Sequence, residues 1–315
     1  MARTFIKNLN EISMQDFDAV GGKNSSLGEM LNNLTKLGIN VPGGFAITSS
    51  AFNEFISNSK IDKVISKELA NLNVENLSDL RRAGKKIRGL ILKTPLPQNL
   101  ISEIQQAWLD VSESGKSFAV RSSATAEDLP DASFAGQQET FLNINGFDNL
   151  IDAVRKVYAS LFTDRAISYR RLRNFKGSLS ISVGVQEMVR SDIGASGVAF
   201  TLDTESGYRG SIFITSSYGL GEGIVQGTVN PDEFYVFKEA LEKNDFPIIK
   251  KSLGEKAKKM IFADNNLPGK SVKYIRVPKK ETNKFSLTDN EIIELAKYAK
   301  TIEDHYKVPM DIEWA

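Results

Sequence analysis

The hydrophobic residues of this chain recur at helical spacing in its first third and at alternating spacing in much of the remainder. Leu27, Met30 and Leu34 follow a Gly-Gly pair and recur every three or four residues, which places them on one face of a helix. A later helix is expected to begin at Thr288, because Glu291 three residues on completes a capping-box pattern. The same spacing predicts helices over residues 61–71, 77–93, 98–113, 147–161, 164–174 and 288–306.

Apolar runs and alternations predict strands elsewhere in the chain. The run 181–189 is mostly apolar, and the short run 117–120 is separated from the run 140–144 by a long polar connection. The Lys-rich stretch 240–285 is interpreted as a protruding β arm with a solvated basic face. Further strands are expected over residues 4–9, 196–202, 211–214 and 233–237.

Together these elements predict an α+β fold for the 315 residues. A mostly helical part is expected over residues 1–115 and a mixed α/β part over residues 116–240. The third part, residues 241–315, is expected to hold the β arm, a helix and a last strand.

Composition excludes several classes of partner. The 40 Lys and Arg residues nearly balance the 39 Asp and Glu residues, so nothing in the net charge of +1 predicts a nucleic-acid or anionic-membrane partner. No apolar run approaches the roughly 20 residues that span a bilayer, and the polar N-terminus is not a signal peptide. We therefore expect a cytoplasmic protein.

The chain has no cysteine and one histidine, His305. These counts exclude disulfides, thiolate chemistry and multi-histidine metal sites. They also nearly exclude a Ser-His-Asp triad, because only His305 could take part in one. His305 lies late in an expected helix, where the helix dipole favours a charged side chain. Chemistry must then come from Lys, Arg, carboxylates, hydroxyls and backbone, which favours phosphate handling with Mg²⁺.

The polar connection that follows residue 120 carries the least ordinary residues. It is expected to begin with Arg121-Ser122-Ser123, and an arginine fork can bind phosphate oxygens in pairs. Small residues around Gly136 would let the backbone approach a ligand, and a loop of this length is typical of a binding or covering loop. The alternative is a surface hairpin with a long acidic loop.

The segment Gly21-Gly22-Lys23 is a second candidate for anion binding. A Gly-Gly turn at a helix N-terminus exposes backbone N–H groups and the positive end of the helix dipole, with Lys23 beside them. The P-loop pattern G-x-x-x-x-G-K-[ST] is absent. The alternative is an ordinary helix entry with a solvated lysine.

The turn from Gly219 to Gly223 resembles a dinucleotide-binding fingerprint only superficially. That fingerprint requires a strand before the turn, a helix after it and a third correctly placed glycine. We expect neither the strand–helix context nor the third glycine here, and we discount that interpretation.

The chain ends on an alternation in which Met310, Ile312 and Trp314 are apolar and Asp311 and Glu313 are acidic. Successive side chains of a strand point to opposite faces, so the two carboxylates share one face. Such a pair suits a hard cation, and the alternative is a half-buried strand with a solvated face. Because the alternation runs to the last residue, we expect a truncated or naturally shortened chain whose last strand lacks a partner.

Six short motifs are spread over the whole chain: Val20-Gly21-Gly22-Lys23-Asn24-Ser25-Ser26-Leu27-Gly28-Glu29, Val41-Pro42-Gly43-Gly44-Phe45, Val120-Arg121-Ser122-Ser123-Ala124, Ser133-Phe134-Ala135-Gly136-Gln137, Gly219-Leu220-Gly221-Glu222 and Met310-Asp311-Ile312-Glu313-Trp314. In this order and spacing they resemble the N-terminal nucleotide-binding domain of the phosphoenolpyruvate synthase and pyruvate phosphate dikinase family. The phosphoenolpyruvate synthases (pyruvate, water dikinases) are the nearer likeness, and the rifampin phosphotransferases are the nearest competitor.

The resemblance implies an ATP-grasp-like fold with two lobes that close on Mg-ATP. It also implies a kinase-type transferase that passes the β-phosphoryl group of ATP to a histidine on a separate swivelling domain. A third domain, which binds pyruvate, then forms phosphoenolpyruvate, so that AMP and phosphate are the other products. These two partner domains are absent from this chain, and His305 does not match the motif of the phosphorylated histidine.

The resemblance implies roles for four charged residues. Lys23 and Arg121 would hold the phosphates and act in catalysis, and Glu313 would bind Mg²⁺ with Asp311 close by. These assignments agree with the chemistry of the residues, because phosphoryl transfer mainly needs positioning and charge neutralisation.

The resemblance also implies a hinge and a covering loop. The hinge over residues 186–189 would meet the adenine, and the loop would cover the phosphates. The ATP contacts implied beyond Lys23 and Arg121 are Ser133, Gly136, Thr140, Gln186, Glu187, Met188, Val189 and Glu222.

One departure from the family concerns the end of the site. In the family, a Gln and an Arg on a strand after the metal-binding strand complete the ATP site, and this chain lacks them. We therefore expect weakened ATP binding and no complete dikinase turnover by this chain alone. The ATP domain of a rifampin-phosphotransferase-like enzyme and a non-catalytic nucleotide-binding protein remain open as alternatives.

Overall fold

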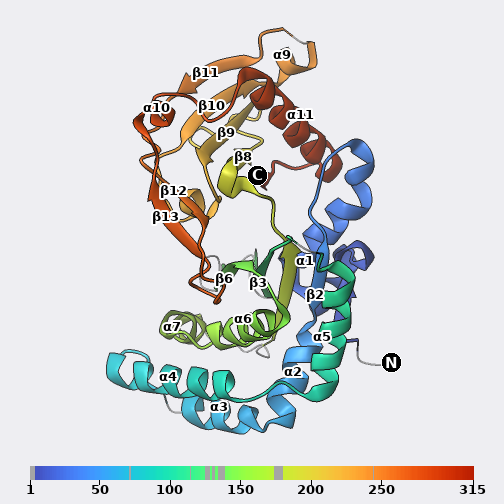
Figure 1. Cartoon of the computed structure of the whole chain (residues 1–315), viewed down its shortest axis with the longest axis vertical. Coiled ribbons are helices and arrows are strands. Elements are labelled where there is room, and N and C mark those ends of the chain that lie inside the picture. Colours follow the sequence, from blue (N-terminus) through green and yellow to red (C-terminus); the bar gives the residue numbers. More distant parts are fainter. Residues whose placement is uncertain are drawn as a thin grey trace. The chain divides into compact units, whose positions relative to one another are not determined.

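The computed structural model describes residues 4–70, 72–113, 115–124, 128–129, 132–133, 139–173, 180–243 and 245–315, without the side chains of 124, 128–129 and 132–133. Contacts divide the chain into two compact units, each with its own sheet and helices (Figure 1). Unit 1 comprises Met1–Met188 and Asn266–Ser271, and unit 2 comprises Val189–Asn265 and Val272–Ala315. The three parts expected from the sequence, with boundaries at 115 and 240, differ from this division and stay a prediction.

The described part of unit 1 combines helices with an antiparallel sheet, as an α+β fold requires. Its helices are α1 (Phe17–Asn33), α2 (Ser49–Asn58), α3 (Ile61–Ala70), α4 (Leu77–Lys93), α5 (Gln98–Val111), α6 (Phe147–Ser160) and α7 (Asp164–Leu172). Its strands are β1 (Ile6–Asn8), β2 (Gly44–Ile47), β3 (Phe118–Ala124), β4 (Asp128–Leu129), β5 (Ala132–Ser133), β6 (Thr140–Ile144) and β7 (Ile181–Glu187).

The main sheet of unit 1 has the strand order β1-β2-β7-β3-β6, and every neighbouring pair is antiparallel. Its register brings together residues that are far apart in the sequence. Arg121 of β3 pairs with Gly184 of β7 on one side and with Thr140 of β6 on the other. Gln186 pairs with Ala119 of β3, so the end of β7 lies beside the start of β3.

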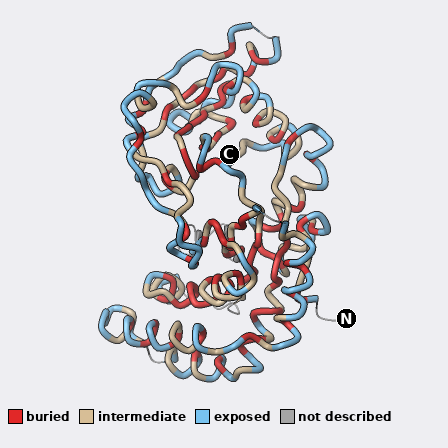
Figure 2. Tube along the Cα trace, viewed as in Figure 1, coloured by how far each residue is buried: buried red, intermediate tan, exposed pale blue. Residues whose placement is uncertain are grey.

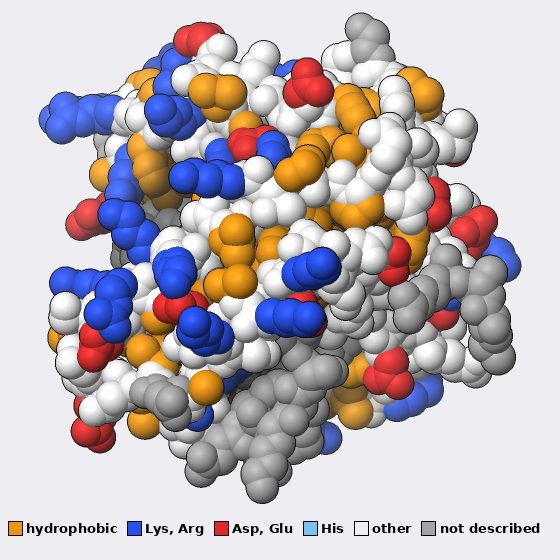
Figure 3. Space-filling model, turned by 90° about the horizontal axis from the view of Figure 1, so that it is seen from below, with side chains coloured by type: hydrophobic (Ala, Val, Ile, Leu, Met, Phe, Trp, Pro, Cys, Tyr) orange, Lys and Arg blue, Asp and Glu red, His pale blue; other side chains and the backbone are white. Residues whose placement is uncertain are grey.

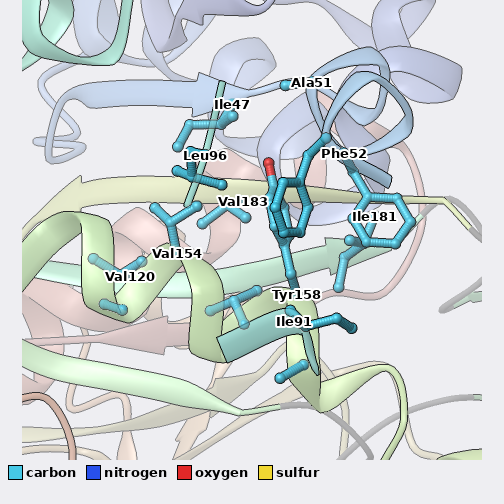
Figure 4. Packing of buried hydrophobic residues seen from close by; sticks show 14 of the residues in the cluster. Ile47, Ala51, Phe52, Ile91, Leu96, Val120, Val154, Tyr158, Ile181 and Val183 are labelled. Carbon is cyan, nitrogen blue, oxygen red and sulfur yellow. The ribbon is translucent and has the colours of Figure 1, made fainter. Parts of the chain in front are cut away.

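One face of this sheet carries the larger hydrophobic core (Figure 4). Ile47, Val120 and Val183 project from the strands, and Phe52 and Tyr158 meet them from α2 and α6. The rings of Phe52 and Tyr158 lie 5.0 Å apart in an edge-on arrangement. Burial of such large side chains contributes about 1.5–3 kcal/mol for each one, so this core holds the helices on that face.

The opposite face of the same sheet is covered by α1. Ala46 packs there with Val20, whereas its neighbours Phe45 and Ile47 belong to the core on the other face. This division follows from the alternation of side chains along a strand.

The structure corrects the expected end of the strand at residue 120. Arg121 and the two serines after it belong to β3, which continues to Ala124, rather than to the loop. Ser122 and Ser123 are buried, and both pair with residues of β7. Tertiary pairing has therefore extended a strand that its own polar sequence did not predict.

Helix α1 also begins earlier than expected. It starts at Phe17, is interrupted at Gly21 and then continues through Lys23. Gly21 has φ 74° and ψ 169°, a conformation that essentially only glycine adopts. The Gly-Gly pair is thus a kink between two helical segments.

The described part of unit 2 is organised around the antiparallel sheet β11-β10-β9-β8-β14. Helix α11 covers one face of this sheet, and buried segments run through the strands and the helix of this unit (Figure 2). Phe234, Val236 and Ile292 are fully buried there. The strands of unit 2 are β8 (Ala195–Phe200), β9 (Ser211–Tyr218), β10 (Asp232–Phe237), β11 (Ile248–Ser252), β12 (Lys258–Phe262), β13 (Val272–Arg276) and β14 (Asp311–Trp314). Its helices are α8 (Glu222–Val225), α9 (Lys238–Lys243), α10 (Lys279–Thr282) and α11 (Asp289–Tyr306).

The expected β arm over residues 240–285 is only partly correct. Strands β12 and β13 do form a separate hairpin, but β11 pairs with β10 inside the main sheet. The start of the stretch is also helical, since α9 runs to Lys243. The expected capping box is confirmed, because Thr288 and Glu291 bond each other's backbone N–H groups at the start of α11.

The expectation for the turn from Gly219 to Gly223 is wrong in one respect. Strand β9 does end at Tyr218, and the short helix α8 does begin at Glu222. However, the next strand, β10, is antiparallel to β9, so the turn is not part of a βαβ unit. The dinucleotide interpretation therefore remains discounted for a topological reason.

Four charged side chains of α4 face solvent. Arg81, Arg82, Lys85 and Lys86 are all exposed, and Arg82 pairs with Asp79. Lys and Arg side chains stand out on the face shown in Figure 3, with Asp and Glu among them. Within the described residues, every helix is too short or too polar to cross a bilayer.

Candidate functional site

The kink in α1 lies against the strand that carries Arg121. A β-carbon built on Gly21 would stand less than 3.0 Å from backbone and side-chain atoms of Ser123. Only a glycine permits this approach, both because of the space and because of its positive φ. Because Lys23 is two residues after Gly21, this contact brings the chain around Lys23 next to the strand that contains Arg121.

Asn24 fixes this junction through hydrogen bonds. Its backbone N–H donates to Ser123 Oγ at 3.1 Å, and its side-chain Nδ2 donates to Ser182 Oγ of β7 at 3.1 Å. The same Nδ2 donates to the carbonyl oxygen of Val20 at 3.0 Å. Asn24 is completely buried, so these bonds satisfy donors that would otherwise be costly to bury.

Gly184 completes the junction from the middle of β7. A β-carbon at this position would stand less than 3.0 Å from Oδ1 of Asn24. Since Gly184 pairs with Arg121 across the sheet, the close contact with Asn24 lies directly beside Arg121. The kink at Gly21, the buried Asn24 and the small Gly184 together set the distance between α1 and β3.

Arg121 projects from the face of the sheet that α1 covers. Val120 is buried in the core on the opposite face, and strand alternation turns the next side chain the other way. Ser123, two residues on, contacts α1, which confirms this direction for β3. Arg121 is half-buried, whereas Lys23 and Thr140 are exposed. The structure therefore pairs Arg121 with Thr140 and brings the segment that contains Lys23 to the same strand, an arrangement consistent with an anion site.

The predicted hinge residues lie at the end of β7, and several of their polar groups already have partners. The backbone N–H groups of Glu187 and Met188 donate to the carbonyl oxygens of Gly43 and Ser117 at 2.9 and 2.8 Å. A base bound to this segment would therefore meet carbonyl oxygens or other groups rather than these two N–H groups.

The hinge side chains have partners as well. The Glu187 carboxylate pairs with Lys116 at 3.2 Å, and this ion pair is the main cause of a raised pKa of Lys116. Gln186 Nε2 donates to the carbonyl oxygen of Pro42 at 3.4 Å. The sulfur of Met188 accepts from the backbone N–H of Asn143 at 2.9 Å. These contacts fix the side chains of Gln186, Glu187 and Met188, while Val189 is exposed.

Gly136 and Ser133 are the predicted residues of the covering loop. Gly136 lies outside the described residues. Ser133 belongs to β5, but its side chain is not among those described. Their role in covering phosphates stays a prediction.

The carboxylates predicted to bind metal lie on β14 in unit 2. Asp311 and Glu313 are exposed, whereas Ile312 and Trp314 between and after them pack against the core under the sheet. This is the alternation that the sequence predicted. Glu313 pairs with Val198 of β8.

A third carboxylate shares this environment. Burial raises the pKa of Glu222 in the first turn of α8, and the charge of Glu313 raises it further. Loss of hydration around its carboxyl group, together with the charge of Glu313, also raises the pKa of Asp311. A cation near these groups would relieve this repulsion. Within the described residues, however, no three Asp, Glu or His side chains are close enough to form a complete metal site.

Sequence reasoning found the charged residues but missed those that position them. Asn24 and Ser123 lay within the motifs and Gly184 within the strand predicted over residues 181–189, yet no pattern in the sequence predicts that they meet across α1, β3 and β7. The only local signal was the Gly-Gly pair before Lys23.

Comparisons with known proteins identify the family of the chain. Residues 17–315 match the family described as the pyruvate phosphate dikinase, AMP/ATP-binding domain. The chain is 56% identical to a phosphoenolpyruvate synthase of Neisseria meningitidis over 100% of its own length and 40% of the relative's. It is 51% identical to the phosphoenolpyruvate synthase of Escherichia coli K12, with 97% of this chain and 39% of the relative covered.

The similarity extends to an archaeal protein. A probable phosphoenolpyruvate synthase of Methanocaldococcus jannaschii is 40% identical over 99% of this chain and 25% of its own length. The chain thus spans about 40% of the length of the bacterial relatives it matches.

Proposed function

Because the chain belongs to the pyruvate phosphate dikinase AMP/ATP-binding domain family, we propose that it is the ATP-binding part of a phosphoenolpyruvate synthase. The observation that supports the proposal is the junction of Gly21 with Ser123, which brings the segment of Lys23 to the strand of Arg121. The relatives named phosphoenolpyruvate synthase favour this function over that of a rifampin phosphotransferase or a non-catalytic protein.

In this proposal the cations of unit 1 bind the phosphates of ATP. Arg121 offers two or more donors in a rigid plane, which suits phosphate oxygens, and Lys23 adds a mobile point charge. Thr140, paired with Arg121, would donate its hydroxyl to the same phosphates. Gln186, Glu187, Met188 and Val189 keep their predicted role at the adenine.

The carboxylates of unit 2 would hold Mg²⁺. Mg²⁺ is usually bound by one or two carboxylates together with waters and substrate phosphates, so the pair Asp311 and Glu313 fits it without a third protein ligand. Burial is the first cause of the raised pKa values of Asp311 and Glu222, and the charge of Glu313 adds to both, so a bound cation would stabilise their ionised forms. Bound Mg²⁺ would supply charge neutralisation at the phosphates.

The wider proposal includes an ATP-grasp-like fold and transfer of the β-phosphoryl group to a histidine on a separate domain. Pyruvate would then receive the phosphate on a third domain, giving phosphoenolpyruvate, AMP and phosphate. A cytoplasmic location belongs to the same proposal. The support is the family match and the coverage of about 40% of each bacterial relative, which leaves room in those proteins for further domains.

The proposal is tested by following the β-phosphate. The chain is mixed with Mg-ATP labelled at that phosphate and with the histidine-bearing remainder of a phosphoenolpyruvate synthase. We expect label on the acceptor histidine, strongly reduced for Arg121→Ala. Arg81→Ala, which removes an exposed arginine of α4, is the matched control and should transfer normally. Equal transfer by the parent and Arg121→Ala would overturn the assignment.

A further inference from the structure

A groove in unit 2 lies outside every residue assigned to the nucleotide. Its cavity volume is about 710 Å³, and it is formed by residues 227–231, 255, 257–258 and 274–276. One wall is the loop after α8, and the other is the open end of the hairpin β12–β13. All of these residues belong to unit 2 and are described.

Two cations face each other directly at this groove. Lys258 of β12 pairs with Arg276 of β13 in the antiparallel register, so their side chains leave the same face of the hairpin. Like charges directly opposite each other destabilise a strand pair. A sequence chosen only for a stable hairpin would place an acidic residue at one of these positions.

The chain supplies no carboxylate to this pair within the part that the structure describes. The other lysines of the hairpin differ in this respect, since Lys273 pairs with Asp264 at 3.2 Å and Lys259 approaches Glu281 at 3.9 Å. The contact made by Lys258 is with an aromatic ring, because its Nζ lies 4.6 Å from the centre of Tyr274. The positive charge of Lys258 and Arg276 is therefore concentrated at the groove.

Neighbouring groups are held in place for binding. The hydroxyl of Tyr274 is hydrogen-bonded to Thr228 Oγ1 at 2.9 Å, which fixes the ring under Lys258. Asn230 accepts the backbone N–H of Glu255 through Oδ1 at 3.0 Å, so its Nδ2 is the part of the amide that can donate to a ligand. Glu255 is the acidic residue among those that line the groove, and it is exposed.

We propose that this groove is a second anion site, which binds a small dianion of phosphate or dicarboxylate chemistry between Lys258 and Arg276. The arginine fork would take two oxygens of one anionic group, and Lys258 would neutralise the second charge. Bound anion would also remove the repulsion across the hairpin. The site is separate from the proposed nucleotide site in the residues it uses.

The test is a titration of the full chain with inorganic phosphate and, separately, with succinate, followed by calorimetry and by melting temperature. Arg121→Ala serves as the background, so that phosphate bound by the nucleotide residues does not contribute. Lys258→Gln and Arg276→Gln remove the proposed ligands. Lys250→Gln is the matched control, because Lys250 also lies over a tyrosine ring, that of Tyr235 at 5.2 Å, but outside the groove.

We expect at least one of the two anions to bind and to raise the melting temperature in the background chain and in the Lys250→Gln control. Lys258→Gln and Arg276→Gln should each weaken that binding at least tenfold, and without anion they should melt no lower than the background chain because repulsion is relieved. Binding of phosphate alone or succinate alone assigns the chemistry. Binding of neither anion at tens of millimolar, or equal binding by the groove variants, would overturn the proposal.

Discussion

Gly21 lies so close to Ser123 that there is no space for a β-carbon on Gly21. The contact joins the kink in α1 to the strand of Arg121, and it explains why a glycine precedes Lys23 at this spacing. The positive φ of Gly21 and its contact with Ser123 are two separate requirements, and they can be separated by experiment.

We predict that Gly21→Ala lowers both stability and nucleotide affinity. Its backbone conformation is essentially restricted to glycine, and the new methyl group would overlap Ser123. Gly38→Ala is the matched control, because Gly38 also has a positive φ, of 84°, but no neighbour within 4 Å. The control should lose about 1–2 kcal/mol of stability and keep its ATP affinity. Denaturant unfolding and calorimetry measure both effects, and equal behaviour of the two variants would contradict the role of the contact.

A second prediction concerns Gly184 and Asn24. Gly184→Ala should destabilise the chain by about 1–3 kcal/mol, because its methyl group would overlap the buried amide of Asn24. Asn24→Ala makes space for that methyl group. The double variant should therefore be more stable than the sum of the single effects allows, by at least about 0.5 kcal/mol. Simple additivity in urea unfolding would show that the two residues do not contact.

The sequence predicted the charged residues of this junction but not its geometry. Lys23 and Arg121 stood out because their motifs combine small residues with a cation. Arg121 was assigned to a loop, however, because Arg-Ser-Ser is not a strand-like sequence; only pairing with β7 makes it a strand. Local patterns do not report on such pairing, since strand preference depends on neighbours that are distant in sequence.

The sequence was sufficient to predict the arrangement of residues where a local alternation of polar and apolar side chains determines it. The alternation from Met310 to Trp314 placed Asp311 and Glu313 on one face, as the structure has them. The proximity of Glu222 to Glu313 could not be predicted from the sequence. Helix α8 and strand β14 are nearly 90 residues apart, and only the order of the strands in the sheet brings them together.

A third prediction concerns Tyr158 in the core of unit 1. Its ring is fully buried, and its hydroxyl has no hydrogen-bond partner within the described structure. Burying a hydroxyl without a partner costs about 1–3 kcal/mol, so Tyr158→Phe should leave stability unchanged or raise it. Tyr218→Phe is the control, because its hydroxyl donates to the carbonyl oxygen of Glu281 at 3.3 Å. A loss of more than about 1 kcal/mol in Tyr158→Phe would show that the hydroxyl is satisfied.

A fourth prediction follows from the cap of α11. Hydrogen bonds from the backbone and side chain of Thr288 hold the pKa of Glu291 below its ordinary value of 4.5. The folded chain therefore binds this proton less readily than the unfolded chain does. The stabilisation is complete above pH 4.5 and is lost as the pH falls through the lower folded value.

Glu291→Gln tests this cap without removing its hydrogen-bond acceptor. At neutral pH the variant should be less stable by about 0.3–1 kcal/mol, because it lacks the negative charge at the helix N-terminus. The difference from the parent should shrink as the pH falls below 4.5. Thermal unfolding between pH 3 and pH 7 measures it, and a difference that does not depend on pH would refute the assignment.

The central claim is that Arg121 and Lys23 form a phosphate site, and titration of Mg-ATP into the chain by calorimetry tests it most directly. We predict saturable binding by the parent and by Arg81→Ala. Arg121→Ala should bind at least about tenfold more weakly, because a charged hydrogen-bonding partner contributes about 1.5–3 kcal/mol. Equal affinity of the parent and Arg121→Ala, or no binding by the parent, would contradict the claim.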